Sequence, residues 1–240
     1  MKKIAIVTTT FNTPQLIEKQ LDCFRKLCQD DFDFIIGDNS TNKEASDFFE
    51  NFAKKEKVIY KKTFKKYQEA NPSDSHSRAL NIVYDEFMDQ YDYFLFVDHD
   101  LFPTKPFSAI GMLGDKILAG SPREYEGKIY FIVSFFIINV SKIDRSIVDF
   151  STYPGLDNGG GLYKIIERYG KECALFLDKV KIPAKYLQYD IVEGNFMHFI
   201  KSSNWDNHLH HQESIDDMME ILNKRIEENE KTVNCLENRQ

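Results

Sequence analysis

The sequence has few of the features that mark disulfide frameworks, structural zinc sites or membrane spans. Its four cysteines are scattered without C-x-x-C spacing, so neither a disulfide framework nor a zinc site is indicated. The apolar run near the N-terminus covers only Ile4 to Val7, which is too short for the core of a signal peptide. No window approaches the roughly 20 apolar residues that a spanning helix needs. We therefore expect a cytoplasmic protein.

An excess of positive charge is also missing. The 31 Lys and Arg against 38 Asp and Glu give a net charge of −7, which argues against nucleic acid as a partner bound through bulk electrostatics. Apolar residues, by contrast, make up 42% of the 240 residues and aromatic residues 14%. This composition supports a sizeable core and excludes general disorder.

Short apolar runs alternate with helical periods through the first half of the chain, a pattern that predicts a parallel sheet with crossover helices. We expect strands at 3–9, 32–37, 58–60 and 93–97, and helices from Pro14, over 43–55 and over 73–90. Ligands in such sheets bind beyond the carboxyl ends of the strands. The loops 8–12, 38–42 and 98–100 are therefore expected to face one crevice.

The second half has fewer long helices. Strands are expected at 117–119, 128–140, 174–180 and 196–200, some of them antiparallel, and a helix at 162–169 after three consecutive glycines. There is no internal repeat and no low-complexity linker. We predict an α/β domain over residues 1–211 with a mixed central sheet, followed by an amphipathic helix over 212–240.

The C-terminal segment carries apolar residues at steps of four and three, the spacing of a heptad seam. The seam consists of Ile215, Met219, Leu222, Ile226, Asn229, Val233 and Leu236. One interpretation is a coiled coil that forms a homodimer, with Asn229 setting the register. The other is a helix docked on its own domain, and the sequence leaves both open.

Two carboxylates follow the apolar run 93–97. Asp98 and Asp100 are separated by one residue at a strand end, so they are expected to project to the same side. Such a pair can hold a hard divalent cation, and a cation neutralises the charge of a nucleoside diphosphate leaving group. Two nearby acids arise easily by chance, but the buried strand before them would deliver this pair to the rim of the sheet.

Four segments in this order resemble the family 2 type of inverting glycosyltransferase, which has the A-type fold of nucleotide-diphospho-sugar transferases (GT-A). They are IAIVTTTFN, GDNST, HSRALN and YFLFVDHDLFP, and the similarity covers residues 1–110 well and the remainder loosely. The resemblance implies a Rossmann-like fold with a mixed sheet flanked by helices. It also implies Mn²⁺ or Mg²⁺ as cofactor.

The resemblance implies roles for a set of polar and aromatic residues at the strand ends. The nucleotide would be lined by Thr8, Thr9, Phe11 and Asn12, with Phe11 stacking on the base, and Asp38 would accept a hydrogen bond from the base. The base or the diphosphate would be approached by His76 or Arg78. The ribose and the metal would be held by Asp98, the metal and the diphosphate by Asp100, and His99 would lie beside the donor. The family pattern has Arg directly before the Asn of the helix, whereas here Leu80 precedes Asn81. The phosphate role of Arg78 is therefore open.

Two further candidates lie late in the chain. Inverting transfer needs a base that takes the proton of the acceptor hydroxyl, and Asp157 in TYPGLDNGGGL resembles the position of that base. The alternative is that Asp157 and Asn158 cap the helix at 162–169 or shape the turn before it. By the same resemblance His198 would be a third metal ligand, and imidazole suits manganese. The alternative for His198 is an ordinary core histidine.

These observations favour a metal-dependent glycosyltransferase that moves a sugar from a nucleotide donor, expected to be a UDP-sugar, to a hydroxyl of a glycan or a lipid-linked acceptor. Inversion follows from the resemblance alone. A nucleotidyltransferase of similar fold is less favoured, because such enzymes carry a glycine-rich loop after the first strand and residues 8–12 contain no glycine. A non-catalytic nucleotide-sugar binder or assembly partner is the third alternative.

A lysine-rich run, KKEKVIYKKTFKK, spans residues 54–66. Such runs usually form a solvated face. The alternative is a peripheral contact with an anionic membrane surface that carries a lipid-linked acceptor, at the inner face of the membrane.

Overall fold

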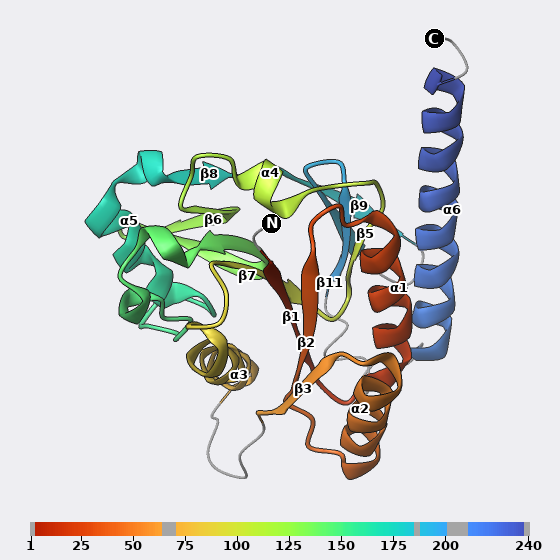
Figure 1. Cartoon of the computed structure of the whole chain (residues 1–240), viewed down its shortest axis with the longest axis horizontal. Helices are drawn as coiled ribbons and strands as arrows, with labels where there is room; N and C mark the ends of the chain where they lie inside the picture. The colour runs from red at the N-terminus through yellow and green to blue at the C-terminus, as the bar shows by residue number, and fades with distance from the viewer. Residues whose placement is uncertain (1–2, 64–70, 185–187, 201–210, 238–240) are drawn as a thin grey trace.

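The computed structural model describes residues 3–63, 71–184, 188–200 and 211–237 (Figure 1). A seven-stranded sheet has the order β3-β2-β1-β4-β7-β6-β8 and a four-stranded sheet the order β5-β11-β10-β9. The larger sheet contains β1 (Ile4–Thr10), β2 (Phe32–Asp38), β3 (Ile59–Lys62), β4 (Tyr93–Asp98), β6 (Leu118–Tyr125), β7 (Lys128–Asn139) and β8 (Ala174–Phe176). The smaller sheet contains β5 (Leu101–Pro103), β9 (Lys179–Pro183), β10 (Gln188–Val192) and β11 (Phe196–Ile200). The helices are α1 (Ile17–Leu27), α2 (Lys43–Glu56), α3 (Pro72–Phe87), α4 (Ala109–Leu113), α5 (Tyr163–Tyr169) and α6 (His211–Glu237).

The first half of the chain forms the expected parallel sheet. β1 pairs in parallel with β2 on one side and with β4 on the other. All seven residues of β1 are buried, because helices cover both faces of the sheet. The apolar residues of α1 and α2 pack on one face of the sheet, and those of α3 and α5 on the other. The carboxyl ends of β1, β2 and β4 consequently meet at one edge.

The second half makes the sheet mixed, as predicted. β7 pairs antiparallel with β4 and with β6, and β8 adds in parallel to β6. The chain bridges the two sheets directly after Asp98, where β4 of the large sheet is followed by β5 of the small one. The register pairs His198 of β11 with Leu101 of β5, so a late residue returns to the end of β4.

Helix α6 docks on its own domain. Ile215, Met218 and Leu222 are buried against the outer face of the small sheet and against α1. The side-chain amide of Asn229 donates a hydrogen bond of 2.8 Å to the carbonyl of Thr104. The seam expected from the sequence therefore faces the domain over its described part, although Met218 is fully buried where Met219 was expected. The C-terminal end of α6 projects beyond the body of the domain (Figure 1).

Several element boundaries differ from the predictions. The expected strand at 174–180 is two strands in different sheets, β8 and β9, because the chain leaves the large sheet after Phe176. β6 runs on to Tyr125, past the three residues expected, since a hairpin with β7 supplies its hydrogen bonds. Helix α3 begins at Pro72, one residue before the predicted start, and is capped by the side chain of Asn71, which accepts from the backbone N–H of Asp74. The short strands β5 and β10 were not expected.

Candidate active site

The site lies at the turn that joins β4 to β5. Asp98 ends β4, and β5 begins three residues later at Leu101. The side chain of Gln20, fully buried in α1, donates from Nε2 to the carbonyls of Asp98 and Leu101, each at 2.8 Å. These two bonds fix the conformation of the turn. Sequence reasoning missed Gln20, although a polar residue on the buried face of an amphipathic helix was a usable signal.

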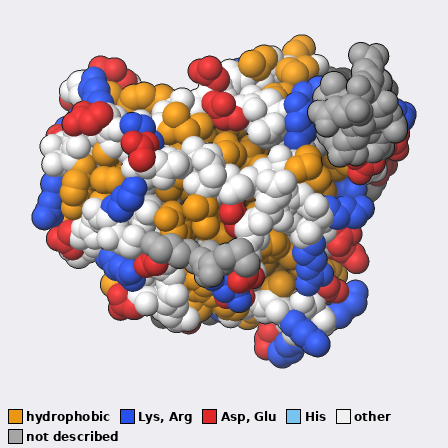
Figure 2. All heavy atoms as spheres, turned by 45° about the horizontal axis from the view of Figure 1, so that its top comes forward, with side chains coloured by type: hydrophobic (Ala, Val, Ile, Leu, Met, Phe, Trp, Pro, Cys, Tyr) orange, Lys and Arg blue, Asp and Glu red, His pale blue; other side chains and the backbone are white. Residues whose placement is uncertain are grey.

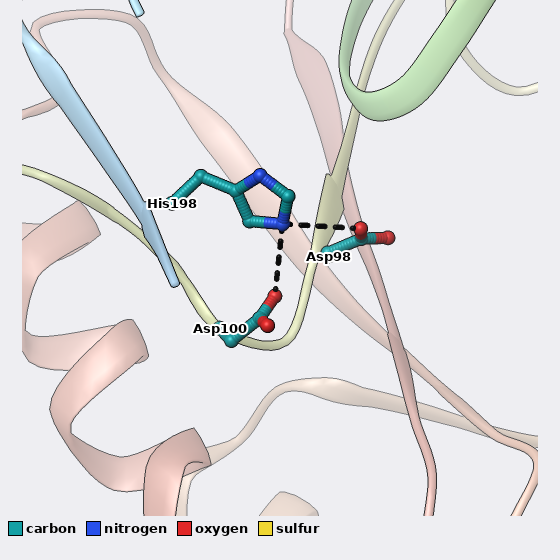
Figure 3. Close-up of side chains that lie close together, drawn as sticks. All are labelled: Asp98, Asp100 and His198. Carbon is teal, nitrogen blue, oxygen red and sulfur yellow. Dashed lines mark ion pairs between the residues drawn. The ribbon is translucent and has the colours of Figure 1, made fainter. Parts of the chain in front are cut away.

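Asp98, Asp100 and His198 converge beyond the end of β4. Nε2 of His198 lies 3.5 Å from Oδ2 of Asp98 and 3.4 Å from Oδ1 of Asp100. Figure 3 shows the imidazole of β11 pointing between the two carboxylates of the turn. The predicted metal set is thus brought together, with one ligand atom of each residue within 4.8 Å of the others.

The charges of this cluster depend on each other. Burial alone would raise the pKa of Asp98, but the hydrogen bond from His198 and the charge of His76 outweigh it and hold this pKa well below its usual range. Burial would likewise lower the pKa of His198, whereas the two carboxylates raise it to about 10. Without a metal, a protonated imidazole therefore supplies the positive charge that the carboxylates require.

The donor set fits a divalent cation of the manganese type. Two carboxylate oxygens and one imidazole nitrogen come from three side chains, all held on strands or on a braced turn. Carboxylates suit Mn²⁺ and Mg²⁺, and an imidazole favours the transition metal. A cation bound here could carry a diphosphate and withdraw charge from it.

His76, from the first turns of α3, is the next neighbour of Asp98. Its Nε2 lies 2.5 Å from Oγ1 of Thr9 and 3.5 Å from Oδ1 of Asp98. Its Nδ1 lies 2.8 Å from Nδ2 of Asn158. An amide nitrogen only donates, so this contact is a hydrogen bond in the tautomer that leaves Nδ1 without a hydrogen. His76 therefore links the ends of β1 and β4 to the loop that carries Asn158, and Asn158 is a site residue that sequence reasoning missed.

Arg78 occupies a different side of the same helix. Two positions along an α-helix correspond to a rotation of about 200°, so Arg78 and His76 start from different sides of α3, and the Nε and Nη2 atoms of Arg78 are buried. Of the two residues considered for the diphosphate, the structure places His76 beside Asp98. His99, between the two aspartates, is buried.

The expected nucleotide loops after β1 and β2 do meet. Asn12 adopts a left-handed backbone conformation with φ of 50°. Its Oδ1 accepts from the backbone N–H groups of Thr41 and Asn42 at 3.1 and 2.9 Å, which ties the two loops together. Thr8 is fully buried in β1, and Phe11 is half-buried in the loop that follows. The contacts of these residues with a nucleotide stay predictions.

Asp38 is enclosed by partners of its own chain. Oδ1 accepts from the N–H of Ser40 at 2.9 Å, and Oδ2 accepts from Tyr60 at 2.8 Å and from Nζ of Lys62 at 2.9 Å. Burial would raise the pKa of Asp38, but the hydrogen bonds from Lys62 and Ser40 outweigh it and lower the pKa. The role expected for Asp38 toward a base would require part of this network to rearrange.

Asp157 lies at the rim and does not touch the metal cluster. Its Oδ1 accepts from Ser73 at 2.6 Å, and its Oδ2 lies 3.3 Å from Nη1 of Arg123. The helical turn that follows has Gly159 at its N-cap and no side-chain cap bond, so the alternative capping role of Asp157 is not used. Its link to the cluster is its neighbour Asn158, which contacts His76.

The described lysines of the basic run mostly face acids of their own chain. Lys54 pairs with Glu50 and Lys55 with Glu56, and Lys61 forms an ion pair with Glu86. Residues 64–66 of the run lie outside the described part of the chain. Figure 2 shows basic and acidic side chains interspersed on one face of the molecule. Among the described helices, none is apolar over a stretch long enough to cross a bilayer.

Solved glycosyltransferases share this architecture. A mannosyltransferase from Pyrobaculum calidifontis, in complex with GDP-Man and Mn²⁺, matches with a TM-score of 0.53 at 13% identity, over 72% of this chain and 54% of that one. The fold is that of a GT-A glycosyltransferase. This confirms the predicted fold class, and the chain spans about half the length of that mannosyltransferase.

Other solved structures are similar at lower scores. The glucosyl-3-phosphoglycerate synthase from Mycobacterium tuberculosis, in complex with phosphoglyceric acid, matches with a TM-score of 0.49 at 14% identity, over 73% of this chain and 69% of that one. The galactosyltransferase LgtC, in complex with donor and acceptor sugar analogues, matches with a TM-score of 0.42 at 15% identity, over 72% and 73%. The sequence matches no protein-family model and no curated protein.

Proposed function

We propose that the protein is a metal-dependent glycosyltransferase that moves a sugar from a nucleotide-sugar donor to an acceptor hydroxyl. One observation carries this proposal. In a GT-A fold, two carboxylates and an imidazole converge at the carboxyl end of β4, where ligands of α/β sheets bind. Asp98, Asp100 and His198 would hold Mn²⁺ or Mg²⁺, which supplies a Lewis acid for the departing diphosphate.

The nucleotide would lie along the ends of β1 and β2. Thr9, Phe11 and Asn12 are placed beside this edge, and His76 stands between it and Asp98. A UDP-sugar is the donor expected from the sequence, and the GDP-Man bound by the Pyrobaculum mannosyltransferase makes a GDP-sugar the second donor to test. Asp38 would bind the nucleobase after losing one of its hydrogen bonds within the protein.

Asp157 would take the proton of the acceptor hydroxyl, with inversion at the transferred carbon. Arg123 lies 3.3 Å from its Oδ2, so a positive charge faces the carboxylate that would accept the proton. Asn158 contacts His76, and His76 contacts Asp98, so the proposed base would be connected through these two residues to the site of the leaving diphosphate. The acceptor would be a glycan or a lipid-linked sugar.

The remaining predictions belong to the same proposal. We place the protein in the cytoplasm, with a peripheral membrane contact where the acceptor is lipid-linked, and without a nucleic-acid partner. Residues 1–211 would form the catalytic domain and 212–240 an appended helix. That helix packs on its own domain, so a homodimer would have to use the part of α6 that projects beyond it.

Donor turnover tests the proposal. The full chain is incubated separately with UDP-glucose, UDP-galactose or GDP-mannose, or with a nucleoside triphosphate and a sugar 1-phosphate, each with Mn²⁺ or with EDTA. We expect release of a nucleoside diphosphate from one donor only when Mn²⁺ is present. Release of pyrophosphate from a nucleoside triphosphate would indicate the nucleotidyltransferase alternative, and donor binding without any release would indicate the non-catalytic binder.

A further inference from the structure

A buried ion pair lies behind the metal cluster. Nζ of Lys179 on β9 is 3.5 Å from Oδ2 of Asp190 on β10 and 3.5 Å from Oγ of Ser134 on β7. Only 17% of the Lys179 side chain and 5% of the Asp190 side chain are exposed. Charged residues are rarely buried this far without a function or a strong set of partners.

Two relationships place this pair next to the proposed metal site. Asp190 is the direct cross-strand partner of His198 in the antiparallel pairing of β10 with β11. Residues opposed in this way project from the same face, with Cβ atoms about 5 Å apart. On the other side, Ser134 precedes Phe135, which pairs with Val97 directly before Asp98. The pair is therefore adjacent to metal ligands from both sheets.

The hydrogen-bonding capacity of Lys179 and Asp190 is only partly used. Good hydrogen bonds to an ammonium are about 2.7–3.0 Å long, so both contacts of Lys179 are at the weak limit, and an ammonium has three donors. Oδ1 of Asp190 is buried and has no hydrogen-bond partner among the described residues. A buried acceptor without a hydrogen bond destabilises the folded protein unless a ligand donates one to it.

We propose that Lys179 and Asp190 form the subsite for the sugar-phosphate end of the donor. The ammonium of Lys179 donates to an oxygen of the phosphate that carries the sugar, and Oδ1 of Asp190 accepts a hydrogen bond from a sugar hydroxyl. A hexosyl phosphate offers an anionic oxygen and hydroxyl donors side by side, which matches one cation and one open carboxylate oxygen. This inference rests on the proposed function, and it adds two donor-binding residues to it.

Binding measurements separate the two residues. Isothermal titration with Mn²⁺ compares wild type, Lys179→Gln, Asp190→Asn and the control Lys181→Gln. Lys181 lies on the same strand and is the cross-strand partner of Asp190, but it is exposed, whereas Lys179 is largely buried. The ligands are the donor turned over by wild type, its nucleoside diphosphate and its nucleoside monophosphate. Loss of a charge-assisted bond should weaken the first two ligands about tenfold or more in Lys179→Gln, while the monophosphate is unchanged. Asp190→Asn should weaken the intact donor more than the diphosphate.

Two outcomes overturn the inference. One is that Lys179→Gln binds the donor and the diphosphate as Lys181→Gln does. The other is that Asp190→Asn loses donor and diphosphate equally while its melting temperature is unchanged. If wild type binds none of the tested nucleotides with Mn²⁺, the proposed function itself fails. If wild type binds the nucleotides and Lys179→Gln binds them equally well, only the subsite is refuted.

A measurement on wild type covers the case in which the variants do not fold. Lysines are acetylated with a water-soluble amine reagent, with and without the donor and Mn²⁺, and the modified peptides are quantified by mass spectrometry. We expect the donor to protect Lys179 and to leave Lys181 reactive. Equal acetylation of Lys179 in both conditions would overturn the inference.

Discussion

Asn158 holds His76 by a contact of 2.8 Å between Nδ2 and Nδ1, and His76 in turn faces Asp98. The glycine-rich loop that carries the proposed base is thereby joined to the end of the central strand β4. A substitution of Asn158 should consequently alter the position of His76 beside Asp98 without removing any metal ligand.

We expect Asn158→Ala to lower kcat by up to about 100-fold, since a misplacement of about 1 Å of a reacting group can have this effect. The affinity for Mn²⁺ should change little. The control is Asn81→Ala, which removes amide bonds to residues 150 and 151 on the same loop system but away from His76. Equal losses of kcat in both variants would contradict a specific role of the Asn158–His76 contact.

Asp100→Asn should weaken Mn²⁺ binding by at least about 100-fold, because even residues outside the ligand set cost 10–100-fold in known metal sites. The substitution keeps the shape of the side chain, so circular dichroism should show an unchanged fold. Asp115→Asn, at a side chain that is 89% exposed, is the matched control. Titration of Mn²⁺ followed by electron paramagnetic resonance measures the affinity, and wild-type affinity in Asp100→Asn would remove Asp100 from the site.

Manganese binding should release a proton from His198 at neutral pH. In the absence of metal, its pKa is raised from 6.5 to about 10, so the imidazole is charged at pH 7. A nitrogen that binds a metal must be deprotonated, so affinity should rise with pH, about tenfold per unit below pH 10. Calorimetry at pH 7 in buffers of different ionisation enthalpy measures the released proton, and an affinity that is flat between pH 6 and 8 would contradict the assignment.

The raised pKa of His198 also predicts how the stability of the metal-free protein changes with pH. The stabilisation from the charged His198 is complete below pH 6.5 and is lost as the pH rises through about 10, because the folded state binds the proton more tightly than the unfolded state. Metal-free wild type should therefore lose more stability between pH 7 and 10 than His198→Gln does. Urea unfolding at several pH values measures this difference, and parallel profiles of the two proteins would be the contrary result.

Gln20→Leu should destabilise the fold by about 2–5 kcal/mol, because two buried carbonyls of the site turn lose their donor. Mn²⁺ affinity should fall with it, since the turn that carries both aspartates is no longer braced. Gln29→Leu, at an exposed position, serves as control in thermal unfolding. A variant with wild-type stability would show that other contacts hold the turn.

Helix α6 offers a test of its docking. Met218 is fully buried, and Met219 is only partly buried. Met218→Ala should cost about 2–5 kcal/mol and Met219→Ala clearly less. Sedimentation of both variants reports on self-association at the same time. A larger loss at Met219, with a dimer that dissociates, would instead favour the coiled coil.

The parallel half of the fold and the core of the site were within reach of the sequence. Buried parallel strands are continuous apolar runs, and acids directly after such a run are delivered to the rim, as at Asp98 and Asp100. The strands β5 and β10 were not predictable in this way. They are only three and five residues long, and their place is set by pairing with β11, which local patterns do not encode.

Side-chain partners were the other limit. Periodicity indicated that α1 has a buried face, but not that Gln20 on that face reaches the carbonyls of a turn 78 residues away. The family resemblance implied that Asp38 binds the nucleobase, whereas Tyr60 and Lys62 of the neighbouring strand enclose it. Such contacts depend on which strands become neighbours, and this is decided by the whole fold.

His198 belongs to the small sheet, whereas Asp98 ends a strand of the large one. A cation shared by these side chains would therefore clamp the two sheets together across their junction. An ion at 100 times its dissociation constant stabilises the folded state by about 2.7 kcal/mol. Metal loading should accordingly slow amide hydrogen exchange in β10 and β11 as well as at the aspartate turn, so occupancy of the site could be followed in the backbone of both sheets.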